Sequence, residues 1–319
     1  MENIEKISFV IPCYGSELTL MNVINEIDDT MKERANEYTY EIVLINDHSP
    51  DNVWSVIENI AKNRKNIKGI SFSKNFGQHS ALMAGYRACT GDIIVTLDDD
   101  GQTPACETFS LVNELKKGYD VVFASYKNTK QPLWRKIGSL LDDKMATILI
   151  KKPKDIKGNS FFVMKSFVAK EMIKYENSYP YIGGLIYRVT KSITNVNVSH
   201  RERQNGKSGY TLFNLIKLWM NGFTAFSIIP LRVSSFVGVL CAFIGFLFGV
   251  ITVIRKLIIP DIQVGWTSTI AILLFVGGLI MLMLGIIGEY IGRIYISINN
   301  APQYVVKQTI NLEDAEDNN

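Results

Sequence analysis

Residues 92–104 read DIIVTLDDDGQTP. An apolar run rich in β-branched residues ends directly in three acids, as in a strand that enters a loop. Because side chains alternate along a strand, we expect Asp98 and Asp100 on one side and Asp99 on the other. Two carboxylates then meet at a strand end, and hard divalent cations prefer such oxygen ligands. Taken alone, the segment could also be a solvated acidic turn.

Similar apolar runs occur before and after this stretch. They are ISFVI (7–11), YEIVLIN (40–46), IKGISF (67–72) and DVVFAS (120–125). Helix-like segments separate them, and this alternation predicts an α/β domain with a largely parallel sheet. Ser49 as N-cap, Pro50 at the first helical position and Asp51 in the first turn predict a helix through about Asn63.

A second acidic strand end supports a ligand site. Asp47 and Asp51 follow the run at 40–46, and in open α/β sheets the carboxyl ends of parallel strands border the ligand crevice. Two acidic strand ends at one crevice indicate a nucleotide site. The turn IPCYGSE (11–17) lacks GxGxxG, and no GxxxxGK[ST] loop is present, so metal and basic side chains would have to neutralise the phosphates.

The C-terminal third has the composition of a membrane hairpin. Two runs, 233–254 and 268–290, are long enough to span a bilayer as helices, the second uncharged up to residue 287. A pair of buried core helices is the alternative. Gly277, Gly278 and Gly285 would let a neighbouring helix approach closely. The distribution of basic residues favours both ends of the hairpin inside.

Two further stretches have helical apolar spacing beside basic residues. Residues 211–232 are too short and polar to span, and they predict an interfacial amphipathic helix. Residues 133–150 fit either an interfacial helix or core packing.

Whole-chain composition narrows the functional class. The chain has 319 residues, 47% of them hydrophobic, and a net charge of only +3, which argues against nucleic acid as a partner. Its four cysteines and three histidines are scattered, so we expect neither a zinc site nor a disulfide framework. Without a cleavable signal sequence, the first domain is expected to stay in the cytoplasm.

Six motifs in order carry a resemblance to a known family, and they extend over about residues 7–295. They are IPCYGSE, VLINDHSPD, SKNFGQHSALMAGYRA, TLDDDGQTP, RERQNGKSGY and GEYIGRIY. In this order the chain resembles family 2 polyprenyl-phosphate glycosyltransferases, which include dolichol-phosphate mannose synthase and the bacterial bactoprenol glucosyltransferases.

The resemblance implies a Rossmann-like GT-A domain (1–210), an interfacial helix (211–232), a transmembrane hairpin (233–298) and a cytoplasmic tail (299–319), of which 311–319 is expected to be disordered. It implies a DxD site for Mg²⁺ or Mn²⁺ at Asp98 and Asp100, which we also expect to be catalytic. The residues implied at the nucleotide sugar are Pro12, Tyr14, Asp47, Asn75, Gln78, Asp98, Asp99 and Gln102. Phe76 and Gly77 fit a packed helix start better.

The resemblance also places the basic segment RERQNGKSGY (201–210) between the catalytic domain and the membrane. Arg203 and Lys207 are expected to act in catalysis by holding a lipid phosphate or the donor diphosphate. Basic residues attracted only to anionic headgroups are the alternative.

The chain departs from the family pattern at two places. Gly15 and Ser16 precede Glu17 where relatives often have asparagine and glutamate. Asn159 and Ser160 stand in a segment where some relatives carry an acid proposed as a base. No protein base is predicted, because a phosphate monoester, with a second pKa of about 6, is already largely dianionic at neutral pH. An inverting single displacement onto polyprenyl phosphate follows.

Other functions stay open at this level. With two spans and no QxxRW element, a processive polysaccharide synthase is disfavoured. A different lipid-linked or protein acceptor and a non-catalytic scaffold are alternatives. By resemblance, we expect a uridine-linked donor of a hexose-type sugar, a location in the bacterial cytoplasmic membrane with the catalytic domain facing the cytoplasm, and a homo-oligomer, a tetramer in relatives.

Overall fold

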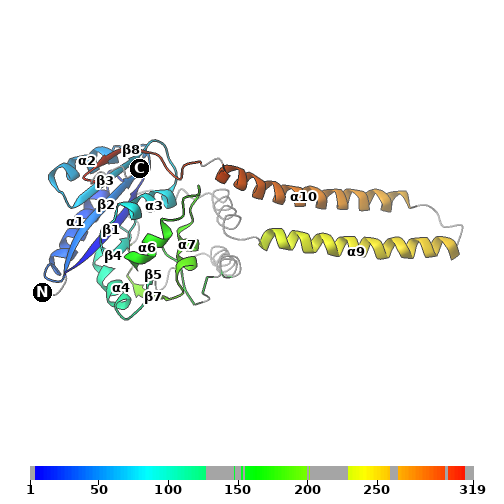
Figure 1. The fold of residues 1–319 in the computed structure, drawn as a ribbon, viewed down its shortest axis with the longest axis horizontal. Coiled ribbons are helices and arrows are strands. Elements are labelled where there is room, and N and C mark those ends of the chain that lie inside the picture. Colours follow the sequence, from blue (N-terminus) through cyan, green and yellow to red (C-terminus); the bar gives the residue numbers. More distant parts are fainter. Residues whose placement is uncertain are drawn as a thin grey trace. The chain divides into compact units, whose positions relative to one another are not determined.

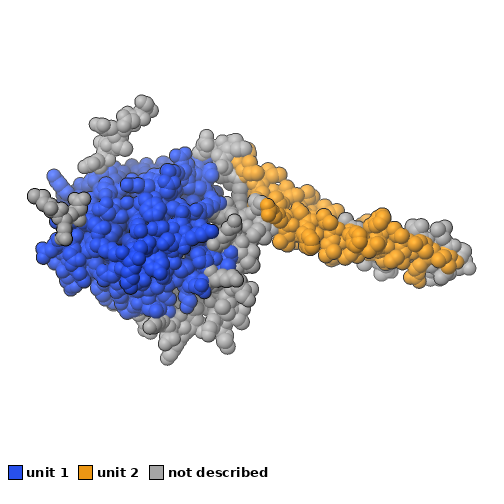
Figure 2. All heavy atoms as spheres, turned by 60° about the horizontal axis from the view of Figure 1, so that its bottom comes forward, with its two compact units in different colours: residues 1–216, 300–319 blue, residues 217–299 orange. Residues whose placement is uncertain are grey.

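The computed structural model describes residues 4–126, 147, 152–153, 155–199, 201, 229–258, 265–298 and 301–312. The chain divides into two compact units, Met1–Ile216 with Asn300–Asn319, and Lys217–Asn299 (Figure 2). The first unit contains the sheet, and the second contains two long helices.

The first unit alternates strands and helices along the chain (Figure 1). Its first half comprises β1 (Glu5–Cys13), α1 (Leu20–Lys32), β2 (Tyr38–Asn46), α2 (Val53–Asn63), β3 (Ile67–Phe72), α3 (Gln78–Ala88) and β4 (Ile93–Thr96). The rest comprises η1 (Ala105–Glu107), α4 (Thr108–Leu115), β5 (Val121–Tyr126), β6 (Phe162–Lys165), α6 (Ser166–Met172), α7 (Ile182–Val189), β7 (Ile193–Val198) and β8 (Val306–Ile310).

Within the described residues, the strands form one eight-stranded sheet in the order β7-β5-β6-β4-β1-β2-β3-β8. β1 pairs in parallel with both β2 and β4, and β2 pairs in parallel with β3. β6 lies antiparallel between β4 and β5. All five strands expected from the sequence are present, and the predicted α/β class is confirmed. The sheet is mixed rather than largely parallel, because β6 and β8 pair only antiparallel within the described residues.

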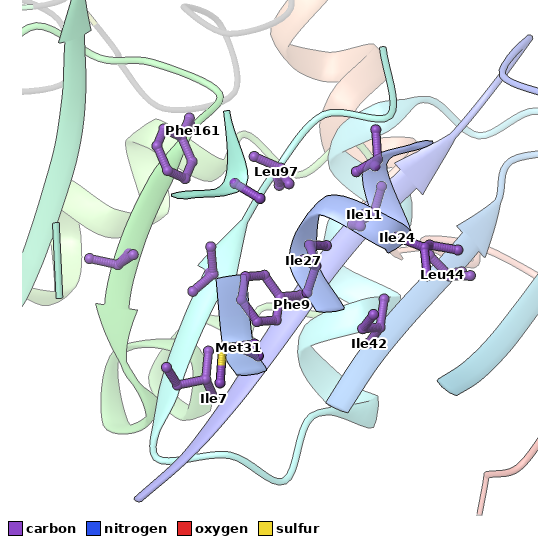
Figure 3. Close-up of a cluster of buried hydrophobic side chains, with 14 of the residues drawn as sticks. Ile7, Phe9, Ile11, Ile24, Ile27, Met31, Ile42, Leu44, Leu97 and Phe161 are labelled. Carbon is purple, nitrogen blue, oxygen red and sulfur yellow. The ribbon is translucent and has the colours of Figure 1, made fainter. Parts of the chain in front are cut away.

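Both faces of β1 are buried, which explains its continuous apolar sequence. Phe9 and Ile11 on one face pack in the cluster that includes Ile24 and Ile27 of α1 (Figure 3). On the other face, α3 approaches closely at Gly85, where an added Cβ would lie 2.4 Å from Val10 Cγ1. β1 is therefore covered by α1 on one face of the sheet and by α3 on the other.

The helix expected from Ser49 begins later than predicted. α2 starts at Val53 and ends at Asn63 as expected. Ser49 Oγ donates to Asp51 Oδ1, which also accepts from Val53 N–H at 3.3 Å. The side chains at 49 and 51 therefore order the loop before the helix, and the predicted N-cap was wrong.

The predicted tail at 299–319 also needs a correction. Val306–Ile310 forms β8, which pairs antiparallel with β3 at the edge of the sheet. Just beyond it, Asn311 Nδ2 donates to the carbonyls of Ala61, Arg64 and Ile67. The strand was missed because its polar sequence, VKQTI, alternates weakly and its side chains are mostly exposed, as is common at an edge.

The segment before β8 is fastened to the same unit. The Arg87 guanidinium donates to Gln303 Oε1 and Tyr304 OH, and also to the carbonyls of Ile173 and Tyr175. Tyr304 stacks on the Phe72 ring with centroids 5.0 Å apart. The chain that returns from the long helices is therefore locked onto α3 and the end of β3.

The second unit consists of α9 (Ile229–Ile258) and α10 (Trp266–Ile298). Each contains a window apolar enough to cross a membrane, Leu231–Ile251 and Phe275–Gly292, and almost none of it is buried. This exposure contradicts the alternative of buried core helices. The structure describes the first helix from Ile229 onward, which is inside the range predicted for the interfacial helix.

The glycines do not act as predicted within the hairpin. A Cβ added at Gly277, Gly278 or Gly285 would meet no described atom within 4 Å. The close approach is instead at Gly238 of α9, where a Cβ would lie 2.9 Å from Met283 Cε of α10. The predicted interfacial helix up to residue 228, nearly all of 133–150, and residues 313–319 lie outside the described residues.

A buried charge network lies at the amino ends of the parallel strands, at the opposite end of the sheet from the acidic residues that follow β2 and β4. The Glu41 carboxylate accepts from Ser8 Oγ and Thr90 N–H and contacts Lys6 Nζ at 2.9 Å and Lys68 Nζ at 3.0 Å. Burial alone would raise the pKa of Glu41, but these donors lower it to about 2. The ionised carboxylate therefore stabilises the fold.

We expect Glu41→Gln to lower the free energy of unfolding at pH 7 by about 2–4 kcal/mol, because an amide cannot balance the two lysines. The carboxylate contributes fully above its ordinary pKa of 4.5, and the contribution is lost as the pH falls from about 4.5 to about 2. Urea unfolding of both proteins should therefore give a smaller difference at pH 3 than at pH 7.

Glu58→Gln is the matched control, because Glu58 pairs with Lys62 on the exposed face of α2 and should contribute less than about 1 kcal/mol. An equal difference between wild type and Glu41→Gln at the two pH values would contradict this account.

Candidate functional site

The acidic turn follows β4 at the carboxyl end of the parallel strands. β4 is central, between β1 and β6, and the chain leaves it through Leu97 into Asp98, Asp99 and Asp100. Gly101 has φ +70°, a conformation that an L side chain rarely adopts. Because β4 pairs in parallel with β1, this turn lies beside the loop that follows β1.

Asp98 is held from two elements. Its Oδ1 accepts a hydrogen bond from Gln78 Nε2 at 3.0 Å, and its Oδ2 accepts one from Ser160 Oγ. Gln78 is the first residue of α3, and Ser160 lies just before β6. Both oxygens thus have fixed directions before any ligand binds.

Asp99 points away from these partners. Its Oδ2 accepts from Tyr14 N–H at 2.9 Å, and its carbonyl accepts from Thr19 Oγ1 at 2.7 Å. Burial raises the pKa of Asp99 to about 6, and the charges of Asp98 and Asp100 add to the rise while the Tyr14 N–H opposes it. β4 ends at Thr96, so the three acids lie in the loop beyond the strand and not on it as the predicted alternation assumed. Asp98 and Asp99 nevertheless have different partners, and Asp99 joins the acidic turn to the loop after β1.

Asp100 closes the turn on itself. Its Oδ1 accepts from Gln102 N–H at 3.0 Å, the short-range bond of an Asx turn. Asp98 and Asp100 are therefore two carboxylates with restricted orientations at the same strand end.

Asp47 supports the start of α3 from beneath. It is only 3% exposed, and its two oxygens accept from Phe76 N–H at 2.7 Å and Gly77 N–H at 2.8 Å. Gly77 has φ +90°, which lets consecutive N–H groups point at one carboxylate. Burial raises the pKa of Asp47, and the two backbone donors oppose that rise.

The brace at Asp47 also involves Asn75, whose Nδ2 donates to the Asp47 carbonyl at 3.2 Å. The loop 75–78 is consequently fixed relative to the end of β2. Gln78, which reaches Asp98 from this loop, inherits that position.

The loops after β1 and β2 are tied together. Gly15 N–H donates to Ser49 Oγ at 2.7 Å, Glu17 N–H donates to Asp51 Oδ2 at 2.9 Å, and Asn52 N–H donates to Glu17 Oε2 at 3.1 Å. Glu17 and Asp51 are therefore loop braces here. The Tyr14 side chain, by contrast, is 56% exposed and is free to meet a flat ligand such as a nucleobase.

The basic segment after β7 begins at the acidic turn. Arg201 N–H donates to the Gln102 carbonyl at 2.9 Å, and Arg201 Nη1 donates to Glu26 Oε2 at 2.9 Å. Glu26 also accepts from Ala105 N–H through its other oxygen. The stem of the segment that carries Arg203 and Lys207 is thus attached to Gln102, while those two residues lie outside the described part.

The structure brings together most of the residues predicted for the nucleotide sugar. Asn75, Gln78, Asp98, Asp99 and Gln102 are joined by the contacts above, directly or through Asp47 and Tyr14. Pro12 is different: it is buried within β1 and offers its position in the strand rather than a free side chain.

The donor set fits a hard divalent cation that keeps several ligands from water and substrate. Among the described residues, no group of three His, Cys, Asp or Glu side chains could hold a metal ion. Mg²⁺ commonly binds through one or two carboxylates and completes its octahedral shell with phosphates and waters. Asp98 and Asp100 match that smaller set.

Sequence reasoning missed three polar residues of the site. Thr19 donates to a backbone carbonyl of the acidic turn, and Glu26 accepts from a backbone N–H just after the turn. The Ser160 hydroxyl donates to the Asp98 carboxylate. Ser160 had been noted only as the place of a missing acid. Nothing in the sequence pairs residue 160 with residue 98 unless the antiparallel β6 is known.

Comparisons with known proteins agree with this geometry. Residues 8–172 match the model of Glycosyl transferase family 2, and residues 229–294 match the GtrB C-terminal hairpin. The chain is 34% identical to the undecaprenyl-phosphate 4-deoxy-4-formamido-L-arabinose transferase of Yersinia pestis bv. Antiqua (strain Angola), over 99% of this chain and 97% of that one. The Yersinia pseudotuberculosis enzyme (serotype O:3, strain YPIII) is 33% identical over the same shares.

A solved structure supports the fold. The glucosyl-3-phosphoglycerate synthase of Mycobacterium tuberculosis, in complex with Mn²⁺ and UDP-glucose, superposes with a TM-score of 0.52 at 18% identity, covering 69% of this chain and 77% of that one. At 18% identity this similarity is evidence for the fold alone, which is the GT-A fold of the first unit. The predicted fold class, a GT-A domain followed by a helical hairpin, is confirmed.

The brace at Asp47 predicts a local effect on loop dynamics. In Asp47→Asn one acceptor oxygen is replaced by an NH₂ group, so Phe76 or Gly77 loses its partner. We expect amide exchange in residues 73–80 to accelerate about tenfold, as the loss of roughly 1.4 kcal/mol implies. Hydrogen exchange of peptides from this loop measures the effect.

Asp29→Asn is the control for this exchange experiment, because Asp29 pairs with Lys32 on the exposed face of α1. Exchange in 73–80 that is unchanged in Asp47→Asn would show that the carboxylate does not hold the loop.

Proposed function

The chain belongs to glycosyl transferase family 2, and we propose that it transfers a sugar from a nucleotide sugar to undecaprenyl phosphate or a similar polyprenyl phosphate. The observation that carries the proposal is the occurrence, in one chain, of a braced two-carboxylate turn and a C-terminal membrane hairpin. A water-soluble acceptor would not require the hairpin. The names of the Yersinia relatives support the same lipid acceptor.

The donor would lie across the carboxyl ends of β1, β2 and β4. Asp98 and Asp100 would hold Mg²⁺ or Mn²⁺, which when bound offsets the charge of the donor diphosphate. Tyr14 would meet the nucleoside with its exposed ring, beside Pro12. Asp47, Asn75, Gln78, Asp99 and Gln102 would border the donor mainly by fixing the loops around it. Crystals of the mycobacterial synthase with Mn²⁺ and UDP-glucose support this class of ligand.

Arg203 and Lys207 would supply positive charge opposite the acidic turn. Their segment starts at Arg201, whose N–H is bonded to the carbonyl of Gln102, two residues from Asp100. Arginine binds phosphate through two parallel hydrogen bonds, and lysine acts as a point charge. We propose that they hold the donor diphosphate or the lipid phosphate.

The reaction would be a single displacement with inversion. An oxygen of the lipid phosphate forms a bond to the anomeric carbon, and the bond from that carbon to the nucleoside diphosphate breaks with its electron pair. The acceptor needs no protein base, because its phosphate is mostly dianionic at neutral pH. The chain's own task is alignment of the two reactants and stabilisation of the leaving diphosphate.

We propose that the enzyme resides in the bacterial cytoplasmic membrane with the first unit in the cytoplasm, where nucleotide sugars are made, and supplies a polyprenyl-monophosphate sugar to cell-envelope glycans. The sugar, whether a hexose or the formamido-arabinose named for the relatives, and a tetrameric assembly both stay predictions.

Activity should depend on the two carboxylates. With undecaprenyl phosphate, Mn²⁺ and a panel of sugar nucleotides, we expect one new glycolipid that carries the sugar on a monophosphate, detected by mass spectrometry. Asp98→Asn and Asp100→Asn should each lower its rate at least a hundredfold, because each removes a negatively charged ligand of the cation that offsets the charge of the diphosphate. EDTA should abolish it.

Asp155→Asn is the matched control for the activity assay, since Asp155 is an exposed turn residue outside the site. If no donor gives a product with the bare lipid phosphate while nucleotide still binds, the proposed acceptor is wrong. If Asp98→Asn retains wild-type activity, the proposed metal site is wrong.

A further inference from the structure

Asp98 has a second neighbour whose role the family resemblance does not give. Besides Gln78 from α3, the hydroxyl of Ser160 donates to the Asp98 carboxylate. Relatives that carry an acid in this segment would present a negative charge near Asp98. A hydroxyl does the opposite: it donates a hydrogen bond to the charged carboxylate and adds no charge of its own.

The pairing of Ser160 with Asp98 follows from the sheet register. β4 and β6 are antiparallel, with Ile93 opposite Lys165 and Thr96 opposite Phe162. Continuing this register by two residues on each strand brings position 160 opposite position 98. Directly opposed residues of an antiparallel pair have Cβ atoms about 5 Å apart, so their side chains interact.

The backbone around Ser160 is fixed although its side chain is exposed. Asn159 Nδ2 donates to the Ala124 carbonyl at 3.0 Å, and Ala124 N–H donates to the Phe161 carbonyl at 3.0 Å. The Phe161 side chain is fully buried in the core (Figure 3). The hydroxyl therefore projects from a rigid strand end, and little entropy is lost when it binds Asp98.

Gln78 and Ser160 restrict the directions in which the lone pairs of the Asp98 carboxylate point. A carboxylate has about four acceptor sites, and here one on each oxygen is used by a side chain. A free carboxylate would have to give up rotational freedom when the metal binds. Preorganised ligands bind more tightly because that loss has already occurred.

We propose that Ser160 is a positioning residue that holds Asp98 in the orientation in which it binds the divalent cation of the donor complex. The inference rests on the proposed function of Asp98 as a metal ligand. It gives the serine a defined task in the segment before β6. Ser160 acts through Asp98 and does not touch the reacting atoms.

The sharpest test compares Ser160→Thr with Ser160→Val. Threonine and valine have nearly the same shape, because both are branched at Cβ, but only threonine keeps the hydroxyl. Mn²⁺ binding to each full-length protein in detergent is measured by electron paramagnetic resonance. The added nucleoside diphosphate is whichever of UDP, GDP and dTDP gives the tightest Mn²⁺ binding to wild type.

We expect Ser160→Val to bind Mn²⁺ about tenfold more weakly than Ser160→Thr, because a hydrogen bond to a charged group is lost. Ser160→Thr should stay within about twofold of wild type. Ser55→Ala, an exposed serine of α2, should bind like wild type. Equal affinities in the threonine and valine variants would overturn the proposal.

A turnover measurement separates positioning from a general structural defect. In Ser160→Val the Mn²⁺ concentration for half-maximal activity should rise about tenfold, whereas kcat at saturating Mn²⁺ should stay within about threefold of wild type. A lowered kcat at every Mn²⁺ concentration, together with unchanged Mn²⁺ binding, would assign Ser160 a different role.

The binding experiment needs no lipid acceptor, so its outcome is independent of the proposed reaction. If wild type makes no glycolipid but the threonine and valine variants differ in Mn²⁺ affinity, the inference about Ser160 stands and the acceptor is wrong. If glycolipid forms normally and the two variants bind Mn²⁺ equally, only the inference about Ser160 is wrong.

Discussion

The double pairing of β1, parallel to β2 on one side and to β4 on the other, is the constraint from which the site follows. In-register pairing brings the carboxyl ends of β1, β2 and β4 to the same end of the sheet, so that the loops after residues 13, 46 and 96 meet. Their polar side chains are then close enough to bond directly. The apolar sequence of β1, buried on both faces, holds this arrangement.

The carboxylates at this end of the sheet have two kinds of hydrogen-bond partner. Asp47 and Asp99 accept from backbone N–H groups of neighbouring loops. Burying a charge is costly unless it is hydrogen-bonded, and these bonds offset that cost while they fix the loops. Asp98 accepts from two side chains, and Asp100 accepts from the backbone of its own turn. A single acidic segment thus supplies both a brace and a binding group.

Much of this could be predicted from the sequence. Five strands follow from the short β-branched apolar runs, and the two long helices follow from the length of their apolar runs, both of which are properties of the local chain. The start of α2, β8 and the contact between Ser160 and Asp98 did not follow, because each depends on residues distant in sequence. Val306–Ile310 becomes a strand only because β3 offers an edge, and Ser160 faces Asp98 only because β6 enters antiparallel between β4 and β5.

The edge strand β8 has a consequence for how the chain can be threaded through a bilayer. The polypeptide leaves the first unit before α9 and rejoins the same sheet after α10. A folded sheet cannot be shared across a membrane, so the path between these two points must cross an even number of times. Pairing of Gly69 with Ile310 therefore sets the parity of the transmembrane path through backbone hydrogen bonds, independently of the basic residues that flank the helices.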